Sequence, residues 1–167
     1  MSQQHLINSL YDAGATDYEA QDGHSIAADE FDAWTADLSA ILACALTQLA
    51  QLVQQSALDL GAGTGVFSRF LAKHGYAVTA LEPSAVMLEH ARVHRDNADL
   101  PPMNFVAGTA EQLPDLALSG FDLIAARQSA CYLADPIATF ADLRTRLNPG
   151  GRLLIIEGIW PRLGLVG

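Results

Sequence analysis

The sequence predicts one α/β domain in which a mostly parallel sheet is covered by helices on both faces. Two observations carry this prediction. From residue 56 onward, short apolar runs alternate with helical segments, and this pattern is typical of strand–helix–strand units joined by right-handed crossovers. The 167 residues are 50% apolar and 17% charged, which is enough to fill one core and too apolar for a disordered chain.

The first 55 residues differ in character from the rest. Residues 1–30 are polar and acidic, with Gly14 and Gly23 as helix breakers, and they predict a short helix or a mobile arm. Residues 31–53 carry apolar side chains at helical spacing, which predicts one amphipathic helix. We therefore expect a single structural domain with an N-terminal helical arm over residues 1–55 and a core over residues 56–167.

Five short apolar runs in the core predict the strands of the sheet. They are residues 57–60, 77–81, 104–107, 121–126 and 152–156. In an open sheet of this kind, ligands bind beyond the carboxyl ends of the strands. We therefore expect the functional site in the loops that follow these ends, near Gly61, Glu82, Gly108 and Arg127.

Helix signals fill the intervals between the predicted strands. The first helix is expected over residues 66–74, and Ser84 is a plausible N-cap for a second helix that runs to about residue 97. Asp135 followed by Pro136 begins the third helix, and the run Asn-Pro-Gly-Gly at 148–151 is expected to end it.

The charge balance disfavours several classes of partner. Nineteen acidic and nine basic residues give a net charge of −10, so we expect neither nucleic acid nor membrane partners. The chain has no apolar run of the ~18 residues that a membrane span needs and no secretory signal at its start, so a cytoplasmic location is expected. Cys44 and Cys131 have no metal-ligand spacing, which predicts two buried thiols and no metal site.

The sharpest motif is an acid followed by three glycines at alternate positions: Asp59, Gly61, Gly63 and Gly65. Glycines are needed where a backbone turns tightly and must approach a ligand closely. A dinucleotide fingerprint would place its third glycine at Val66, so this spacing disfavours a pyrophosphate ligand. A P-loop is excluded because no Gly-Lys-Ser/Thr follows.

A second candidate, Glu82, ends the second predicted strand. A carboxylate there can accept hydrogen bonds from both hydroxyls of a ribose, and each such bond contributes roughly 1.5–3 kcal/mol. It would also repel a phosphate, which favours a nucleoside ligand. An acid at this position suits the ribose of NAD as well, so that ligand stays open at this point.

Five motifs follow one another in a fixed order along the core. They are the runs 59–65 (Asp-Leu-Gly-Ala-Gly-Thr-Gly), 80–84 (Ala-Leu-Glu-Pro-Ser), 108–114 (Gly-Thr-Ala-Glu-Gln-Leu-Pro), 121–124 (Phe-Asp-Leu-Ile) and 147–154 (Leu-Asn-Pro-Gly-Gly-Arg-Leu-Leu). In this order they resemble the class I S-adenosylmethionine-dependent methyltransferases over roughly residues 56–157. The resemblance implies a Rossmann-like three-layer αβα sandwich with strand order 3-2-1-4-5. It also implies S-adenosyl-L-methionine as cofactor and S-adenosyl-L-homocysteine as product.

The resemblance further implies a role for each part of the site. The glycine bend would lie along the methionine part, Glu82 would hold the ribose, and the run 108–114 would contact the adenine. The residues after the fourth strand would line the sulfonium and the acceptor entrance, and Tyr11 with Tyr18 resembles an arm that folds over the cofactor. The implied cofactor-binding residues are Tyr18, Asp59, Gly61, Ala62, Gly63, Gly65, Glu82, Pro83, Ala110, Glu111, Arg127 and Gln128.

One feature departs from the family pattern. Members usually continue past the fifth strand with a helix and an antiparallel hairpin, and residues 158–167 are too few for these elements. The strand 152–156 is then expected to form an uncovered apolar edge, through which the chain would form a homodimer. The alternative is that the chain is a fragment.

The leading functional hypothesis is a methyltransferase that acts on a small-molecule acceptor. The alternatives are a non-catalytic or truncated S-adenosylmethionine-binding module and an NAD- or nucleotide-binding Rossmann domain. The cofactor carries its own leaving group, so the sequence assigns no catalytic residue. His24 and Tyr132 are candidates for the acceptor site, whereas His74, His90 and His94 are expected to face solvent from helices.

Overall fold

The computed structural model describes residues 3–21, 24–26, 31–43 and 54–158. Its centre is a five-stranded parallel sheet with the order β3-β2-β1-β4-β5, which confirms the predicted topology. The strands are β1 (Ser56–Leu60), β2 (Ala77–Glu82), β3 (Asn104–Ala107), β4 (Phe121–Arg127) and β5 (Leu147–Ile156). Within the described residues, no helix is long and apolar enough to cross a membrane.

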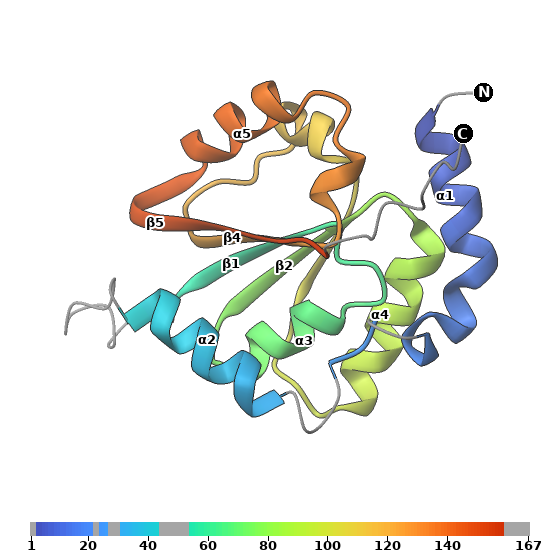
Figure 1. The fold of residues 1–167 in the computed structure, drawn as a ribbon, viewed down its shortest axis with the longest axis horizontal. Coiled ribbons are helices and arrows are strands. Elements are labelled where there is room, and N and C mark those ends of the chain that lie inside the picture. The colour runs from blue at the N-terminus through green and yellow to red at the C-terminus, as the bar shows by residue number, and fades with distance from the viewer. Residues whose placement is uncertain (1–2, 22–23, 27–30, 44–53, 159–167) are drawn as a thin grey trace, which may run out of the picture.

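Helices cover both faces of this sheet (Figure 1). One face carries α2 (Phe31–Ala43), α3 (Val66–Lys73) and α4 (Ala85–Asn97), and the other carries η3 (Ala110–Asp115) and α5 (Pro136–Thr145). Two apolar clusters fill the layers, one under α2 and α3 and one under η3 and α5. The central strands β1 and β4 contribute to both clusters, so their side chains are buried on both faces, as a parallel sheet requires.

The predicted helix starts in the core are confirmed by their capping contacts. The Ser84 hydroxyl accepts a hydrogen bond from the Met87 N–H at 3.0 Å, and the Asp135 carboxylate accepts one from the Ala138 N–H at 3.0 Å. Each side chain satisfies a backbone donor that the first turn of a helix leaves without a partner. These caps set where α4 and α5 begin, and with them the loops that precede these helices.

Two local predictions were wrong. The helix that begins at Pro136 ends at Thr145, before the run 148–151, because this run forms the irregular start of β5, where the register against β4 shifts. Gly150 has a φ of +83° there. Cys131 is exposed on η4 (Ala130–Tyr132) and is not buried. Cys44 and the predicted helix residues 44–53 lie outside the described residues.

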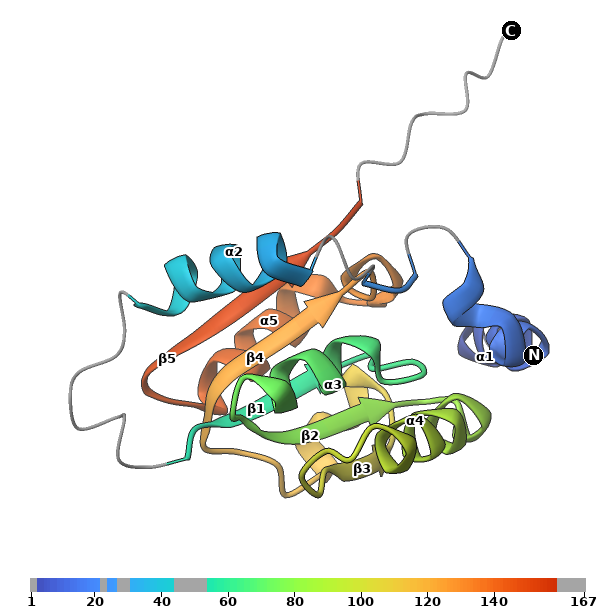
Figure 2. The same ribbon diagram turned by 90° about the horizontal axis from the view of Figure 1, so that it is seen from below.

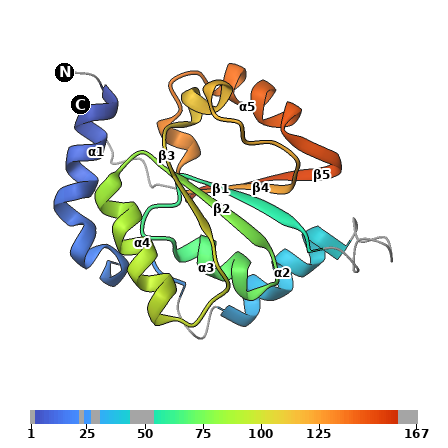
Figure 3. The same cartoon turned by 180° about the vertical axis from the view of Figure 1, so that it is seen from behind.

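The N-terminal segment forms α1 (Gln3–Gly14) and the short helix η1 (Ala15–Ala20). Figure 2 shows α1 beyond the carboxyl ends of the strands, and Figure 3 shows it beside α4. Asn8 donates a hydrogen bond to the carbonyl of Pro83 at 3.4 Å, and the Ser84 hydroxyl donates one to Asp12. The helix α1 therefore lies over the sheet edge at which the sequence predicts the site.

Candidate functional site

A cavity that is partly open to solvent lies at the carboxyl ends of β1, β2 and β4. Its walls come from these strand ends, from η3 and η4, and from α1 and η1. A smaller cavity adjoins it beside the glycine bend. A cavity at this edge of an α/β sheet is typical of a small-molecule site.

The structure brings the predicted site residues together, with one exception. Gly65 lies outside the walls of both cavities. Asp59 and Ala62 line the smaller cavity. The other predicted residues line the larger cavity: Tyr18, Gly61, Gly63, Glu82, Pro83, Ala110, Glu111, Arg127 and Gln128.

Gly61 turns the chain at the end of β1. Its φ is +70°, and the N–H groups of Gly61 and Ala62 both donate to the carbonyl of Leu81, at 2.8 and 3.1 Å. A Cβ at this position would lie 2.5 Å from the Cβ of Ser129. Glycine is therefore required here both by the left-handed backbone and by the close approach of the loop after β4.

The other two glycines of the bend differ in what surrounds them. A Cβ on Gly63, whose φ is +55°, would meet only the ring of Tyr18 at 3.9 Å, so this glycine faces the arm across the cavity. A Cβ on Gly65, whose φ is +81°, would lie 3.0 Å from the Cβ of Ala91 on α4. Gly65 thus serves the packing of the bend against α4, which explains its absence from the cavity wall.

Glu82 lies at the end of β2, next to the glycine bend that follows β1. Its Oε2 accepts the N–H of Gly63 at 3.0 Å and its Oε1 accepts the N–H of Ser84 at 2.9 Å. Burial raises the pKa of the Glu82 carboxyl, and these two hydrogen bonds act in the opposite direction. Each carboxylate oxygen keeps a further acceptor position. The side chain can therefore accept two more hydrogen bonds from a ligand in the cavity.

Asp59 is the most deeply buried acid of the site, with 1% of its surface exposed. Its Oδ2 accepts a hydrogen bond from the Ser68 hydroxyl at 2.5 Å. Burial raises the pKa of Asp59 to about 6, against the smaller opposing effects of Ser68 and Arg127. The smaller cavity therefore has a wall whose charge changes close to neutral pH.

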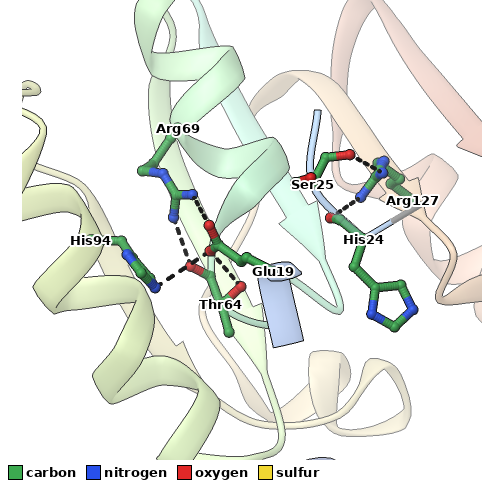
Figure 4. A network of polar contacts seen from close by, with 7 residues as sticks. All are labelled: Glu19, His24, Ser25, Thr64, Arg69, His94 and Arg127. Carbon is green, nitrogen blue, oxygen red and sulfur yellow. Dashed lines mark hydrogen bonds and ion pairs between the residues drawn. The ribbon is translucent and has the colours of Figure 1, made fainter. Parts of the chain in front are cut away.

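Glu19 ties the N-terminal arm to the glycine bend (Figure 4). Its Oε1 accepts the Thr64 hydroxyl at 2.7 Å, and its Oε2 pairs with the Arg69 guanidinium at 2.8 Å. Arg69 also donates to the carbonyl of Thr64 at 2.9 Å, and His94 on α4 lies 3.5 Å from Glu19. These contacts hold η1 beside the bend and explain why Tyr18 reaches the cavity. No sequence pattern singles out Glu19, because only the fold brings it near residue 64.

Arg127 and Gln128 follow β4 at the edge of both cavities. The Arg127 guanidinium donates to the carbonyls of His24 and Ser25, at 3.2 and 3.5 Å (Figure 4). It also lies 5.6 Å from the ring centre of Trp34. Gln128 has a φ of +55°, which is uncommon for a residue with a side chain. Strained backbone of this kind clusters at ligand sites.

One face of α1 forms a wall of which the sequence predicted Tyr11 alone, as part of the arm. Gln4, Ile7, Asn8 and Tyr11 all line the larger cavity. Their spacing of three and four residues places them on one side of a helix. This periodicity could have predicted that one face of the helix lines the site, but the polar character of residues 1–30 concealed it.

The two candidates for the acceptor site both lie in the walls. His24 lines the smaller cavity and stacks on Tyr18, with 4.2 Å between the ring centres, and Tyr132 lines the larger cavity. The expectation that His74 faces solvent was wrong. Its Nδ1 is 2.8 Å from the carbonyl of Phe70 and its Nε2 is 3.2 Å from the Thr35 hydroxyl, because α2 packs over this end of α3.

The chain is similar to known methyltransferases. The family model for the methyltransferase domain matches residues 58–155. An uncharacterized methyltransferase of Mycobacterium tuberculosis is 36% identical over 99 residues, which are 59% of this chain and 38% of that protein. Demethylmenaquinone methyltransferase of Renibacterium salmoninarum is 33% identical over 110 residues, which are 66% of this chain and 44% of that protein. The chain thus spans less than half the length of these relatives.

Solved structures agree with this similarity. An arsenic(III) S-adenosylmethionine methyltransferase from Chlamydomonas reinhardtii superposes with a TM-score of 0.54 at 28% identity, over 60% of this chain and 37% of that one. A phosphoethanolamine N-methyltransferase from Haemonchus contortus, solved with S-adenosyl-L-methionine, superposes with a TM-score of 0.69. It covers 93% of this chain and 35% of that one at 21% identity, and so supports the fold alone.

The sheet order, the glycine bend and the cavity beyond the strand ends define a Rossmann-like fold of the class I methyltransferase type. The family match covers more than half of the chain, from the middle of β1 almost to the end of β5. The chain therefore belongs to the methyltransferase domain family.

We expect Gly61→Ala to destabilise the protein more than Gly75→Ala does. Both glycines have a positive φ, +70° and +88°, so each substitution carries the backbone strain of about 1–2 kcal/mol. Only Gly61→Ala also forces a Cβ against Ser129, while nothing lies within 4 Å of a Cβ at Gly75. Urea denaturation should show an extra loss of about 1–3 kcal/mol for Gly61→Ala. Equal losses would contradict the close approach of Ser129.

The pKa of Asp59 predicts a specific pH dependence of stability. Because the folded-state pKa of about 6 exceeds the unfolded value near 4, the folded protein binds more protons between these pH values. The free energy of unfolding should therefore fall by about 3 kcal/mol as the pH rises from about 4 to above 6. Asp59→Asn should remove this fall, as measured by urea denaturation across the pH range. Identical pH profiles for the two proteins would contradict the assignment.

Proposed function

We propose that this chain binds S-adenosyl-L-methionine and transfers its methyl group to a small-molecule acceptor. The observation that carries the proposal is that the Glu82 carboxylate and the glycine bend share the wall of one cavity beyond β1 and β2. The membership of the methyltransferase domain family supports the same ligand.

The residues present fit this cofactor. Glu82 would accept hydrogen bonds from the two ribose hydroxyls through its remaining acceptor positions. Pro83, Ala110 and Glu111 would lie beside the adenine. The backbone of the bend, with Asp59 beneath it, would lie along the methionine part.

The bend has room for a ligand because it lacks side chains on its cavity side. Gly63 faces the cavity, and a Cβ at this position would have only the Tyr18 ring in reach, at 3.9 Å. Tyr18 would close over the cofactor from the arm, and Arg127 with Gln128 would line the sulfonium and the acceptor entrance.

The cofactor supplies a methyl group on a good leaving group, so the chain's own residues have to position the acceptor and exclude water. The helix α1 lies over the cavity, and the contacts of Glu19 with Thr64 and Arg69 keep η1 against the bend. An acceptor enclosed in this way would be held in line with the methyl group. No residue of the site is assigned a proton-transfer role.

A small-molecule acceptor agrees with the names of the relatives. Ubiquinone biosynthesis O-methyltransferase of Saccharophagus degradans is 25% identical over 69% of this chain and 48% of that protein, and the demethylmenaquinone enzyme has a small-molecule acceptor in its name as well. The net charge of −10 disfavours a nucleic acid acceptor. Since the chain spans less than half of these relatives, methyl transfer itself has to be tested separately from cofactor binding.

Replacing Glu82 tests the cofactor site directly. Glu82→Ala should weaken S-adenosylhomocysteine binding by about 2 kcal/mol, or about thirtyfold, because the acceptor for the ribose hydroxyls is lost. Isothermal titration calorimetry measures this change. Glu89→Ala is the matched control, since Glu89 is an exposed acid on α4 whose carboxylate pairs with Arg92 on the same helix. Equal affinities of the two variants for S-adenosylhomocysteine would contradict the assignment of Glu82 to the ribose hydroxyls.

Two further titrations separate the alternatives. NAD should not compete with S-adenosylhomocysteine, and tighter binding of NAD would favour a dinucleotide-binding domain. A panel of small acceptors incubated with labelled cofactor distinguishes an enzyme from a module that only binds.

We also propose that the chain self-associates through β5. Among the described residues, β5 pairs with β4 alone, and Leu153 and Ile155 are more than a third exposed. An apolar edge strand offers backbone donors and acceptors to a second copy. Light scattering should show a dimer that Leu153→Lys dissociates, whereas Ile137→Lys on the exposed surface of α5 should leave it intact. A monomeric parent protein would overturn this proposal.

A further inference from the structure

Three tyrosines from three separate elements meet in the wall of the larger cavity: Tyr11 on α1, Tyr18 on η1 and Tyr132 on η4. The ring centres of Tyr11 and Tyr18 are 5.9 Å apart with an angle of 66° between the planes. Those of Tyr11 and Tyr132 are 5.8 Å apart with an angle of 88°. Rings set nearly at right angles to one another form walls in different directions, as in the cages that bind organic cations.

The phenol groups of Tyr11 and Tyr18 stay neutral. The Tyr11 hydroxyl donates to the Tyr132 hydroxyl at 2.6 Å, and burial, together with this contact, raises the pKa of Tyr11. Burial raises the pKa of Tyr18 as well. Neither phenol can therefore remove a proton from an acceptor at neutral pH, and both rings keep the electron-rich faces that attract a cation.

The charges around the cavity favour a cationic guest. Two carboxylates, those of Glu82 and Glu111, and one guanidinium, that of Arg127, line the larger cavity. The guanidinium already donates to the carbonyls of His24 and Ser25 and lies over the Trp34 ring. An acceptor that carries a carboxylate or phosphate would be repelled by the two acids, whereas a positively charged group would be attracted.

We propose that the acceptor is an amine and that the tyrosine cluster (Tyr11, Tyr18 and Tyr132) binds its nitrogen end. This inference rests on the proposed methyl transfer. The amine enters as the free base after it has lost its proton to solvent. Its nitrogen lone pair forms the new N–C bond while the S–C bond breaks, and that electron pair stays on sulfur. The positive charge passes to nitrogen, where the ring faces stabilise it.

The same walls disfavour a hydroxyl acceptor. An alcohol has to lose its proton during the transfer, and this requires a base at the acceptor. The phenols of Tyr11 and Tyr18 hold their protons. Among the described residues that line the larger cavity there is no histidine, and His24 lies in the adjoining cavity, where its ring stacks on Tyr18. An amine needs no such base, because its free form is already a nucleophile.

Binding of a cation and of its neutral isostere tests this inference without any turnover. The probes are choline and 3,3-dimethyl-1-butanol, which have the same shape and differ in the charge of the central atom. Calorimetry on the full chain, with and without S-adenosylhomocysteine, should show that choline binds about tenfold more tightly. Tyr132→Leu should abolish the preference, and Tyr132→Phe, which keeps the ring, should retain it.

The outcomes separate this inference from the cofactor proposal. Equal affinity for the two probes, no binding of either, or a preference that survives Tyr132→Leu would overturn the cation site. None of these results bears on S-adenosylhomocysteine binding. If S-adenosylhomocysteine does not bind the parent chain, the cofactor proposal is overturned. The comparison of the two probes in the absence of S-adenosylhomocysteine would still decide whether the tyrosines bind a cation.

Discussion

The site depends on the convergence of three strand ends at the left-handed bend of Gly61. The N–H groups of Gly61 and Ala62 reach the carbonyl of Leu81 at the end of β2, and the Ser129 hydroxyl reaches the carbonyl of Leu60 at 2.6 Å. A side chain on Gly61 would separate these loops, because its Cβ would overlap Ser129. The absence of one side chain thus lets β1, β2 and β4 end at a common point, and the cavity lies directly beyond that point.

A second set of contacts adds the N-terminal arm to this convergence. Glu19 binds the bend through Thr64 and Arg69, while Tyr11 reaches Tyr132 on the far side of the cavity. Besides its hydrogen bonds with Pro83 and Ser84, the arm is therefore held beside the methionine end and beside the proposed acceptor end. Because these attachments are hydrogen bonds or ion pairs at partly exposed positions, each is individually weak.

Much of the sheet and of the proposed cofactor site was predictable, because local patterns determine both. Apolar runs gave the strands, and Glu82 followed from its place at a strand end. Glu19 was not predictable, since its partners lie 45 and 50 positions away in the sequence. Gly65 was expected to bind the methionine part of the cofactor because the motif does not distinguish a glycine that faces a ligand from one that packs on a helix. Cys131 was expected to be buried because cysteine is usually a buried residue type, and composition does not show which loops are exposed to solvent.

The buried acids link the stability of the protein to its ligand. Asp59 and Glu82 are both largely buried, and each carries a carboxyl whose charged form burial disfavours. Such groups weaken the folded state at neutral pH, and a sequence selected for stability alone would replace them with apolar residues. The two acids lie beside an open cavity, and a bound ligand would explain why they are there. Its hydroxyl groups would donate hydrogen bonds to Glu82, and its positive charge would lie near both carboxylates. A ligand that binds only the folded state then restores stability by an amount that grows with the logarithm of the ligand concentration above its Kd. The same acids that weaken the empty fold thus favour a guest with hydroxyl donors at one end and a positive centre at the other.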